Sequence, residues 1–333
     1  MRSNSLEIKK ILLICCGEIG SRHLQALAKI ELPVKIWVID PNLNSLEIGK
    51  KRFDEIPTNT NIKSIKFEHH LPDNLDEVDL CIISTTSKIR FFVLKQIAEK
   101  ISCKNIIFEK VLFQIEEHFT EAEKIIENKG IKCWVNNFRR EEKYWKDVRK
   151  YFVDKGNFRL YYGKSDWRLC TNVIHIVDLI SWLSNEMITK IDCSKLDKEI
   201  YESKRSGFIE LTGIITGETS NNGTFEIHAV KDIPDTEVEF KISNHTTRLY
   251  VNEAKGEAIL MKKENNWKPE MHKFYIQFQS EKTQEVVKSI LDTGNCNLPT
   301  FKESANIHKL LLKNIMKHLN KISSTRYDSC PIT

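Results

Sequence analysis

The feature that most constrains the fold is a short apolar run that stops at two closely spaced glycines and continues into a helix-forming stretch. The run KILLI at residues 10–14 leads into CCGEIG at residues 15–20, and SRHL follows. Strand, tight turn and helix in this order open a dinucleotide-binding βαβ unit. Cys15 stands where the G-x-G-x-x-G fingerprint has its first glycine, so the turn by itself fits an ordinary strand-to-helix turn equally well.

The two glycines of this turn have separate physical roles. Gly17 lets the backbone come close to a pyrophosphate, and Gly20 lets the helix pack closely on the strand. The N–H groups at the start of the helix then bind phosphate oxygens. The predicted cofactor contacts in this turn are Cys16, Gly17, Glu18, Ile19 and Gly20.

Strand and helix patterns alternate through the first 136 residues. After the opening strand, apolar strand patterns occur at 34–39, 78–84, 105–108 and 131–135. Helical patterns occur at 21–30, 45–53, 91–100 and 115–128. This alternation predicts a doubly wound parallel sheet with right-handed crossovers, so residues 1–136 are the predicted Rossmann domain.

Asp40 ends the second predicted strand, about twenty residues after the glycine turn. A carboxylate there accepts hydrogen bonds from the adenosine ribose hydroxyls and repels a 2′-phosphate, which favours NAD over NADP. The alternative is that Asp40, Pro41 and Asn42 form a polar turn that caps the helix at 45–53.

Past about Val153 the pattern changes to that of an α+β domain. One helical stretch at 172–183 is followed by strand-like segments near 188–197, 208–216, 223–230, 237–243, 246–251 and 256–261. Glycine and asparagine in the turns predict a large, open, mainly antiparallel sheet that meanders. Two helical stretches follow, near 284–291 and 303–320. We therefore expect a second, α+β domain over 137–333, whose last helices pack back on the first domain.

Composition argues against several classes of function. The 51 basic and 46 acidic residues nearly balance and form no long run of like charge, so nucleic acid is not an expected partner. No apolar stretch approaches the roughly 20 residues of a membrane span, and the polar residues 1–5 do not resemble a signal peptide, so we expect a cytoplasmic protein. The nine cysteines include no C-x-x-C pair and are expected to be buried thiols, with no metal site.

Two further stretches place titratable groups at a sheet edge and on one face of a helix. Lys110 follows the strand at 105–108, at the carboxyl edge of a parallel sheet, where ligands bind in such folds. His175 and Asp178 are three residues apart and share a helix face with Thr171. Removing a hydride and a proton from an alcohol requires a general base and a group that stabilises the alkoxide. Lys110 and His175 are the predicted acid–base pair.

Each of these residues also has an ordinary structural interpretation. Lys110 fits a surface lysine at a strand end. His175 fits a core histidine, because its helix is largely apolar, and Asp178 then serves as its hydrogen-bond partner. Basic and aromatic groups that would hold a diphosphate or a carboxylate are Arg139, Arg140, Trp167 and Arg168. An ordinary solvated surface explains their presence nearly as well as ligand binding does.

Together these stretches resemble the glucose-fructose oxidoreductase / inositol dehydrogenase family, often called Gfo/Idh/MocA. The resemblance covers the whole chain and rests on the glycine turn with SRH after it, Glu109-Lys110, Arg139-Arg140 and the helix reading H-x-x-D-L-x-x-W-L. It implies an NAD(P)-dependent oxidoreductase that acts on a hydroxyl of a sugar, polyol or nucleotide sugar. A nucleotide sugar for surface polysaccharide biosynthesis is one such substrate.

The resemblance also implies roles for individual residues. The family's catalytic lysine maps onto Lys110, and its histidine maps onto His175. Cofactor contacts beyond the glycine turn and Asp40 are then Ser84, Thr85, Glu109 and Lys110. Candidate substrate contacts are Arg139, Trp167, Arg168, Thr171, Asn172 and Asp178. The open sheet implies substrate binding and assembly into a homodimer or homotetramer.

Four positions depart from the family pattern. Val111 replaces the proline of E-K-P, which would loosen the bend that aims Lys110. Arg90 replaces a histidine, Cys15 replaces a glycine, and Thr171 replaces an aspartate and cannot act as a base at neutral pH. These departures keep a second function open, that of a sugar-nucleotide or dinucleotide sensor, or complex subunit, that kept the fold and lost the reaction. A dinucleotide-binding regulator of transcription is a third, against which the missing basic patch argues.

Overall fold

The computed structural model describes residues 7–165, 167–230 and 239–333. The predicted strand residues 237 and 238 and the polar residues 1–5 lie outside these ranges. The chain divides into two compact units. The first comprises Met1–Asn136 with Gln277–Lys302, and the second comprises Asn137–Ile276 with Glu303–Thr333.

The first unit is built on a parallel sheet with the strand order β3-β2-β1-β5-β7-β8. Its strands are β1 Lys9–Ile14, β2 Val34–Ile39, β3 Ile62–Glu68, β5 Leu80–Ile83, β7 Asn105–Phe108 and β8 Lys132–Val135, with a short separate pair, β4 Glu77–Val78 and β6 Ser102–Cys103. Its helices are α1 Glu18–Leu27, α2 Leu43–Asp54, α3 Ser87–Lys100, α4 Glu116–Lys129 and α7 Gln279–Thr293. The predicted doubly wound parallel sheet is confirmed.

The edge strand β3 is absent from the sequence prediction. It reads IKSIKFE and lies beside β2 at one end of the sheet. Lys63 and Lys66 interrupt the continuous apolar run that marks the buried strands. Edge strands commonly carry lysine, because a charged side chain there discourages pairing with another chain.

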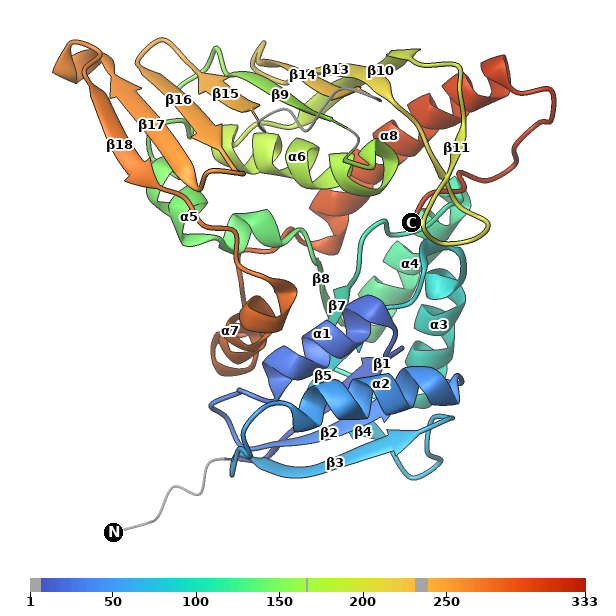
Figure 1. Ribbon diagram of the computed structural model, residues 1–333. Helices are drawn as coiled ribbons and strands as arrows, with labels where there is room; N and C mark the ends of the chain where they lie inside the picture. The colour runs from blue at the N-terminus through green and yellow to red at the C-terminus, as the bar shows by residue number, and fades with distance from the viewer. Residues whose placement is uncertain (1–6, 166, 231–238) are drawn as a thin grey trace. The chain divides into compact units, whose positions relative to one another are not determined.

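The core of the first unit explains why a late helix belongs to it. Leu24 of α1 and Val287 of α7 are fully buried in one apolar cluster with strands β1, β2 and β5. Burying a side chain of this size stabilises a fold by about 1.5–3 kcal/mol. Helix α7 therefore packs against α1, although some 250 residues separate them in the sequence (Figure 1). The other face of the sheet is covered by α3 and α4 (Figure 1).

The second unit is built on a sheet with the strand order β10-β13-β14-β9-β15-β16-β17-β18. Its strands are β9 Arg159–Ser165, β10 Ile188–Leu196, β13 Gly213–Thr219, β14 Thr224–Val230, β15 Glu239–Ser243, β16 Thr247–Asn252, β17 Glu257–Lys262 and β18 Pro269–Lys273, with a separate pair, β11 Tyr201–Glu202 and β12 Ile209–Glu210. The predicted open, mainly antiparallel sheet is confirmed. It is not a simple meander, because β9 lies between β14 and β15 and runs parallel to β14.

The helical segments of the second unit are the 3-10 helices η1 Phe138–Glu141 and η2 Lys263–Asn265 and the helices α5 Lys143–Arg149, α6 Leu169–Ser184 and α8 Phe301–Ile322. Helix α6 lies along one face of the eight-stranded sheet (Figure 1). Most of its residues are buried, which matches its nearly continuous apolar sequence. The sequence prediction starts this helix three residues later and omits α5, β9 and β18.

Two further expectations concern composition. Among the residues that the structure describes, no helix is both long enough and apolar enough to cross a membrane. All nine cysteines are free thiols, and Cys15 and Cys296 are the two that are only partly buried.

Candidate functional site

The glycine turn between β1 and α1 begins with a residue in an unusual conformation. Cys15 has φ +68°, in the left-handed region that residues with a Cβ seldom adopt. Glycine takes this conformation without strain, so the turn uses a positive φ at the position where the fingerprint has glycine. Burial, with a smaller contribution from the Asp40 charge, raises the pKa of the Cys15 thiol to about 12. The thiol is therefore protonated at neutral pH.

The two glycines of the turn have different surroundings. A Cβ on Gly20 would lie 2.0 Å from the Cys15 carbonyl oxygen and 2.7 Å from Ser84 Oγ, so only glycine fits there. A Cβ on Gly17 would meet no atom within 4 Å. Gly20 therefore serves close packing inside the protein, whereas Gly17 leaves open space beside the backbone.

Helix α1 begins directly after Gly17, which is its N-cap. The N–H groups in the first turn of a helix have no intrahelical acceptor and carry the positive end of the helix dipole. Glu18 lies in this first turn, and Arg52 of α2 binds its carboxylate at 3.1 Å. The guanidinium thereby offsets the acidic charge in the first turn of the helix, which would oppose an anion there.

Asp40 fixes the glycine turn from the end of β2. Its carboxylate accepts hydrogen bonds from the backbone N–H of Cys16 at 2.7 Å and of Asn42 at 2.9 Å. The cap of α2 is Asn42, whose side chain accepts from the Ser45 N–H at 3.2 Å. A carboxylate has about four acceptor positions, so these two bonds leave acceptor capacity for a ribose hydroxyl.

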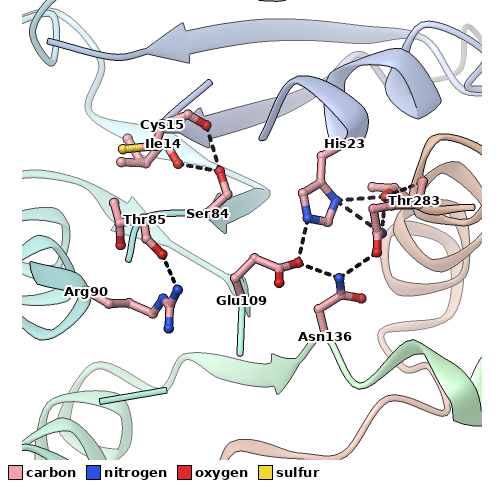
Figure 2. Close-up of polar contacts among 10 residues, drawn as sticks. Ile14, Cys15, His23, Ser84, Thr85, Arg90, Glu109, Asn136 and Thr283 are labelled. Atoms are coloured by element: carbon pink, nitrogen blue, oxygen red, sulfur yellow. Dashed lines mark hydrogen bonds and ion pairs between the residues drawn. The ribbon is translucent and has the colours of Figure 1, made fainter. Parts of the chain in front are cut away.

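Two side chains tie neighbouring turns together at the carboxyl edge of the parallel sheet (Figure 2). The Ser84 hydroxyl, after β5, lies 2.8 Å from the Ile14 carbonyl oxygen and 2.6 Å from that of Cys15. Arg90 of α3 donates to the Thr85 carbonyl on one side. On the other side it donates to the carbonyls of Val111 and Leu112, which directly follow Lys110.

Glu109 is buried in a polar network at the end of β7 (Figure 2). His23 Nε2 of α1 lies 2.8 Å from Glu109 Oε1, and His23 Nδ1 lies 2.8 Å from the Thr283 hydroxyl of α7. Asn136 donates to the same Glu109 oxygen. Burial acts to raise the pKa of Glu109, but the bonds from His23 and Asn136 outweigh it and hold the pKa below its usual range. Glu109 is thus an ionised anchor for the turn that carries Lys110.

Lys110 follows this anchor and is half-buried. The peptide bond between Lys110 and Val111 is cis. Every residue predicted to contact the cofactor lies in the first unit, on the turns after β1, β2, β5 and β7 or in the first turn of α1. Whether each of them touches a dinucleotide stays a prediction.

In the second unit, His175 and Asp178 lie on the buried part of α6. His175 is 8 % exposed and makes an edge contact with the Phe138 ring, with 5.3 Å between the centroids. Asp178 is fully buried and accepts two hydrogen bonds from Arg140, at 2.8 Å from Nε and 2.7 Å from Nη2. Burial raises the pKa of Asp178 despite the opposing Arg140 charge.

The start of α6 brings in a carboxylate that the sequence analysis misses. The Thr171 hydroxyl donates a hydrogen bond to Glu210 Oε1, and Glu210 Oε2 accepts from the Cys170 N–H at 2.9 Å. Glu210 ends β12, some 40 residues further along the chain, and is almost fully buried. A glutamate in a short strand carries no local signal of such a role, so only the packing of β12 beside α6 reveals it.

The remaining predicted substrate contacts have partners of their own in the second unit. Arg139 forms an ion pair with Glu253 and lies over the Phe240 ring. Trp167 is largely buried and donates to the His228 carbonyl at 3.0 Å, and Asn172 donates to the Trp167 carbonyl at 2.7 Å. Arg168 is exposed, with φ +57°, at the N-cap of α6. These contacts do not test the predicted roles, which stay predictions.

Comparison with solved structures gives close likenesses over nearly the whole chain. UDP-N-acetylglucosamine 3-dehydrogenase from Acidithiobacillus ferrooxidans aligns over 96% of this chain and 100% of its own, with 12% identity and a TM-score of 0.69. Scyllo-inositol dehydrogenase from Lactobacillus casei aligns over 95% of this chain and 97% of its own, with 17% identity and a TM-score of 0.66. Levoglucosan dehydrogenase, solved with NADH and levoglucosan, aligns over 95% of this chain and 98% of its own, with 14% identity and a TM-score of 0.68. No protein-family model and no curated protein sequence matches the chain.

The chain has the Gfo/Idh/MocA fold. In this fold Lys110 belongs to the first unit and His175 to the second, so their meeting at one substrate stays a prediction. The first unit on its own fits a dinucleotide. The open space at Gly17, the start of α1 beside it and the carboxylate of Asp40 are features with which folds of this kind hold a pyrophosphate and a ribose.

Proposed function

We propose that this protein is an NAD(P)-dependent oxidoreductase that transfers a hydride between a nicotinamide cofactor and a secondary alcohol or ketone of a sugar or nucleotide sugar. The first unit binds the cofactor, and the second binds the substrate. The observation that carries the proposal is Gly17, an N-cap glycine with open space where its side chain would be. Among the residues that the structure describes, none comes close enough to require glycine there, whereas a pyrophosphate at the α1 N-terminus would require it.

The cofactor would be held by the first turn of α1 and by Asp40. The α1 N–H groups would bind the pyrophosphate, and Asp40 would bind the ribose hydroxyls, which favours NAD over NADP. The bound nicotinamide supplies the acceptor or donor of hydride. Ser84 and Arg90 hold the turns around this site in fixed positions.

Residues of the protein then have to accept the proton of the substrate hydroxyl and stabilise the charge that develops on its oxygen. Lys110, as an ammonium, stabilises the negative charge that develops on the substrate oxygen. His175 accepts the hydroxyl proton as the general base, since a neutral imidazole has one ring nitrogen that can accept a proton. Thr171 lies one helical turn before His175, and helical side chains lean toward the N-terminus, so the Thr171 hydroxyl and Glu210 belong to the same part of the site.

The proposed substrate class follows from the structural neighbours, whose names specify a nucleotide sugar, an inositol and an anhydrosugar. The polar groups of the α6 region suit a polyhydroxylated ligand, because hydroxyls both donate and accept hydrogen bonds. We further propose that the protein acts in the cytoplasm, for example in surface polysaccharide biosynthesis, and assembles into a homodimer or homotetramer through its open sheet. Light scattering would measure the assembly.

The experiment that tests the proposal pairs two alanine variants. Gly17→Ala should leave the stability of the ligand-free protein unchanged, because its Cβ meets no atom, but should weaken NADH binding at least tenfold. Gly20→Ala should lower stability itself, because its Cβ overlaps the Cys15 carbonyl. NADH fluorescence measures binding and thermal melting measures stability. Equal NADH affinity of Gly17→Ala and the natural protein would show that the pyrophosphate does not bind at this turn.

Turnover is tested with NAD⁺ or NADP⁺ and a panel of UDP-N-acetylglucosamine, scyllo-inositol and levoglucosan. Formation of the reduced cofactor with any of them supports the oxidoreductase. Two departures from the family pattern favour a second candidate, a binding protein or sensor: Cys15 has a Cβ where the fingerprint has glycine, and Thr171 stands in place of an aspartate. NADH binding with no hydride exchange across the panel would favour that candidate instead.

A further inference from the structure

The least expected residue at the carboxyl edge of the first unit's sheet is a buried arginine. Arg90 is the fourth residue of α3 and is 1 % exposed. Removing a guanidinium from water is costly unless its N–H groups find acceptors inside the protein. The buried position of Arg90 therefore requires hydrogen-bond acceptors that offset the cost of removing its guanidinium from water.

These acceptors include backbone carbonyls from two different turns, and Figure 2 shows the one from Thr85. One terminal nitrogen of Arg90 donates to the Thr85 carbonyl in the turn after β5. The other donates to the Val111 carbonyl and, at 3.0 Å, to the Leu112 carbonyl in the turn after β7. The rigid, planar fork of a guanidinium suits this bridge, whereas a lysine ammonium offers one point of charge.

We propose that Arg90 is the positioning residue for Lys110: it joins the turn after β5 to the turn after β7 and thereby fixes the backbone that presents the lysine. The inference rests on the proposed function for its consequence in catalysis. The two carbonyls that Arg90 holds belong to the residues directly after Lys110, so moving them moves the lysine.

The need for such an anchor follows from the residue at position 111. A proline ring would restrain the backbone after Lys110 covalently, and Val111 has no ring. Glu109 is held on the other side of Lys110 by His23 and Asn136. The backbone is therefore held before Lys110 by the contacts of Glu109 and after Lys110 by the hydrogen bonds from Arg90 to residues 111 and 112.

The test compares Arg90→Met, which removes the donors at similar length, with Arg90→Lys, which keeps the charge but not the fork. Lys88→Met is the matched control, because Lys88 lies on the same helix and is exposed. Hydrogen–deuterium exchange in the ligand-free protein is read for peptides that cover residues 84–90 and 109–114. Circular dichroism and thermal melting check that each variant is folded.

We expect amide exchange across 109–114 to be at least tenfold faster in Arg90→Met, intermediate in Arg90→Lys and unchanged in Lys88→Met. Unchanged exchange in a folded Arg90→Met or Arg90→Lys protein would overturn the proposal. In turnover, kcat should fall about 10- to 100-fold with KM for NAD within threefold, since a misplacement near 1 Å has that effect. Equal losses of NAD affinity and kcat would also overturn it, because they would indicate general damage to the site.

The two proposals fail in different ways. If the natural protein neither binds NADH nor transfers hydride, the proposed function fails while exchange still decides whether Arg90 anchors the turn. If it turns over and a folded Arg90→Met protein keeps the natural kcat, the proposed function stands and the positioning role fails.

Discussion

The Thr171 hydroxyl donates its hydrogen bond to the Glu210 carboxylate, so a carboxylate lies one side chain away from the position where the related family has aspartate. Thr171 by itself cannot accept a proton at neutral pH, but its oxygen can accept a hydrogen bond from a substrate hydroxyl while its own proton points to Glu210. The departure from the family pattern at position 171 is therefore compatible with catalysis.

This pair predicts that Glu210→Gln lowers kcat by about 10²-fold, because the neutral amide replaces the carboxylate that orients the Thr171 hydroxyl beside the proposed base His175. The amide oxygen of glutamine still accepts from the Cys170 N–H, so the cap of α6 and the thermal stability should change little. Thr171→Asp in the Glu210→Gln background should recover activity, because it places a carboxylate directly on α6. If Glu210→Gln turns over at the natural rate, Glu210 serves only as a helix cap.

The positive φ of Cys15 predicts that glycine is the better residue there. Cys15→Gly should stabilise the protein by about 1 kcal/mol, since a left-handed non-glycine residue costs on the order of 1–3 kcal/mol. It should also tighten NADH binding. Cys15→Ala is the control, because it removes the thiol but keeps the Cβ and its strain. Equal melting temperatures for the two variants would mean that the conformation at Cys15 is not strained.

The lowered pKa of Glu109 predicts how stability depends on acid. Because the folded-state pKa lies below the value of about 4.3 for an unfolded chain, the ionised group stabilises the fold above that pH. This contribution is lost as the pH falls from about 4.3 through the lower folded-state pKa. Urea unfolding between neutral and acid pH should therefore show a weaker pH dependence for Glu109→Gln. The control variant Glu116→Gln, at an exposed position, should leave the pH dependence of unfolding unchanged.

The bidentate pair between Arg140 and Asp178 predicts a large loss of stability on breaking it. Asp178→Ala removes the bidentate partner of the buried Arg140 guanidinium, leaves it Glu303 at 3.5 Å, and should cost about 3–5 kcal/mol of unfolding free energy. Changing both residues, as Arg140→Met with Asp178→Leu, should recover most of that loss in urea unfolding. A small effect of Asp178→Ala alone would argue for a substrate role of Asp178 instead of a structural one.

Local pattern determines much of this molecule. The alternation of apolar strands and helices over the first 136 residues predicts the parallel sheet, and CCGEIG predicts the turn that opens it. These features are readable because side-chain periodicity and glycine placement act over a few neighbouring residues. The lysine-bearing edge strand β3 escapes the same reasoning, since an edge strand need not be continuously apolar.

Only the tertiary structure decides which polar groups meet. Glu210 accepts from Thr171, Arg140 donates to both oxygens of Asp178, and Arg90 donates to Leu112, although the two residues of each pair are far apart in sequence. No periodicity encodes such pairs, because they form only when packed elements bring buried donors and acceptors together, where each must find a partner. The sequence alone thus determines the sheet and its glycine turn, whereas packing decides that Cys15 sits at a positive φ and that a carboxylate lies beside Thr171.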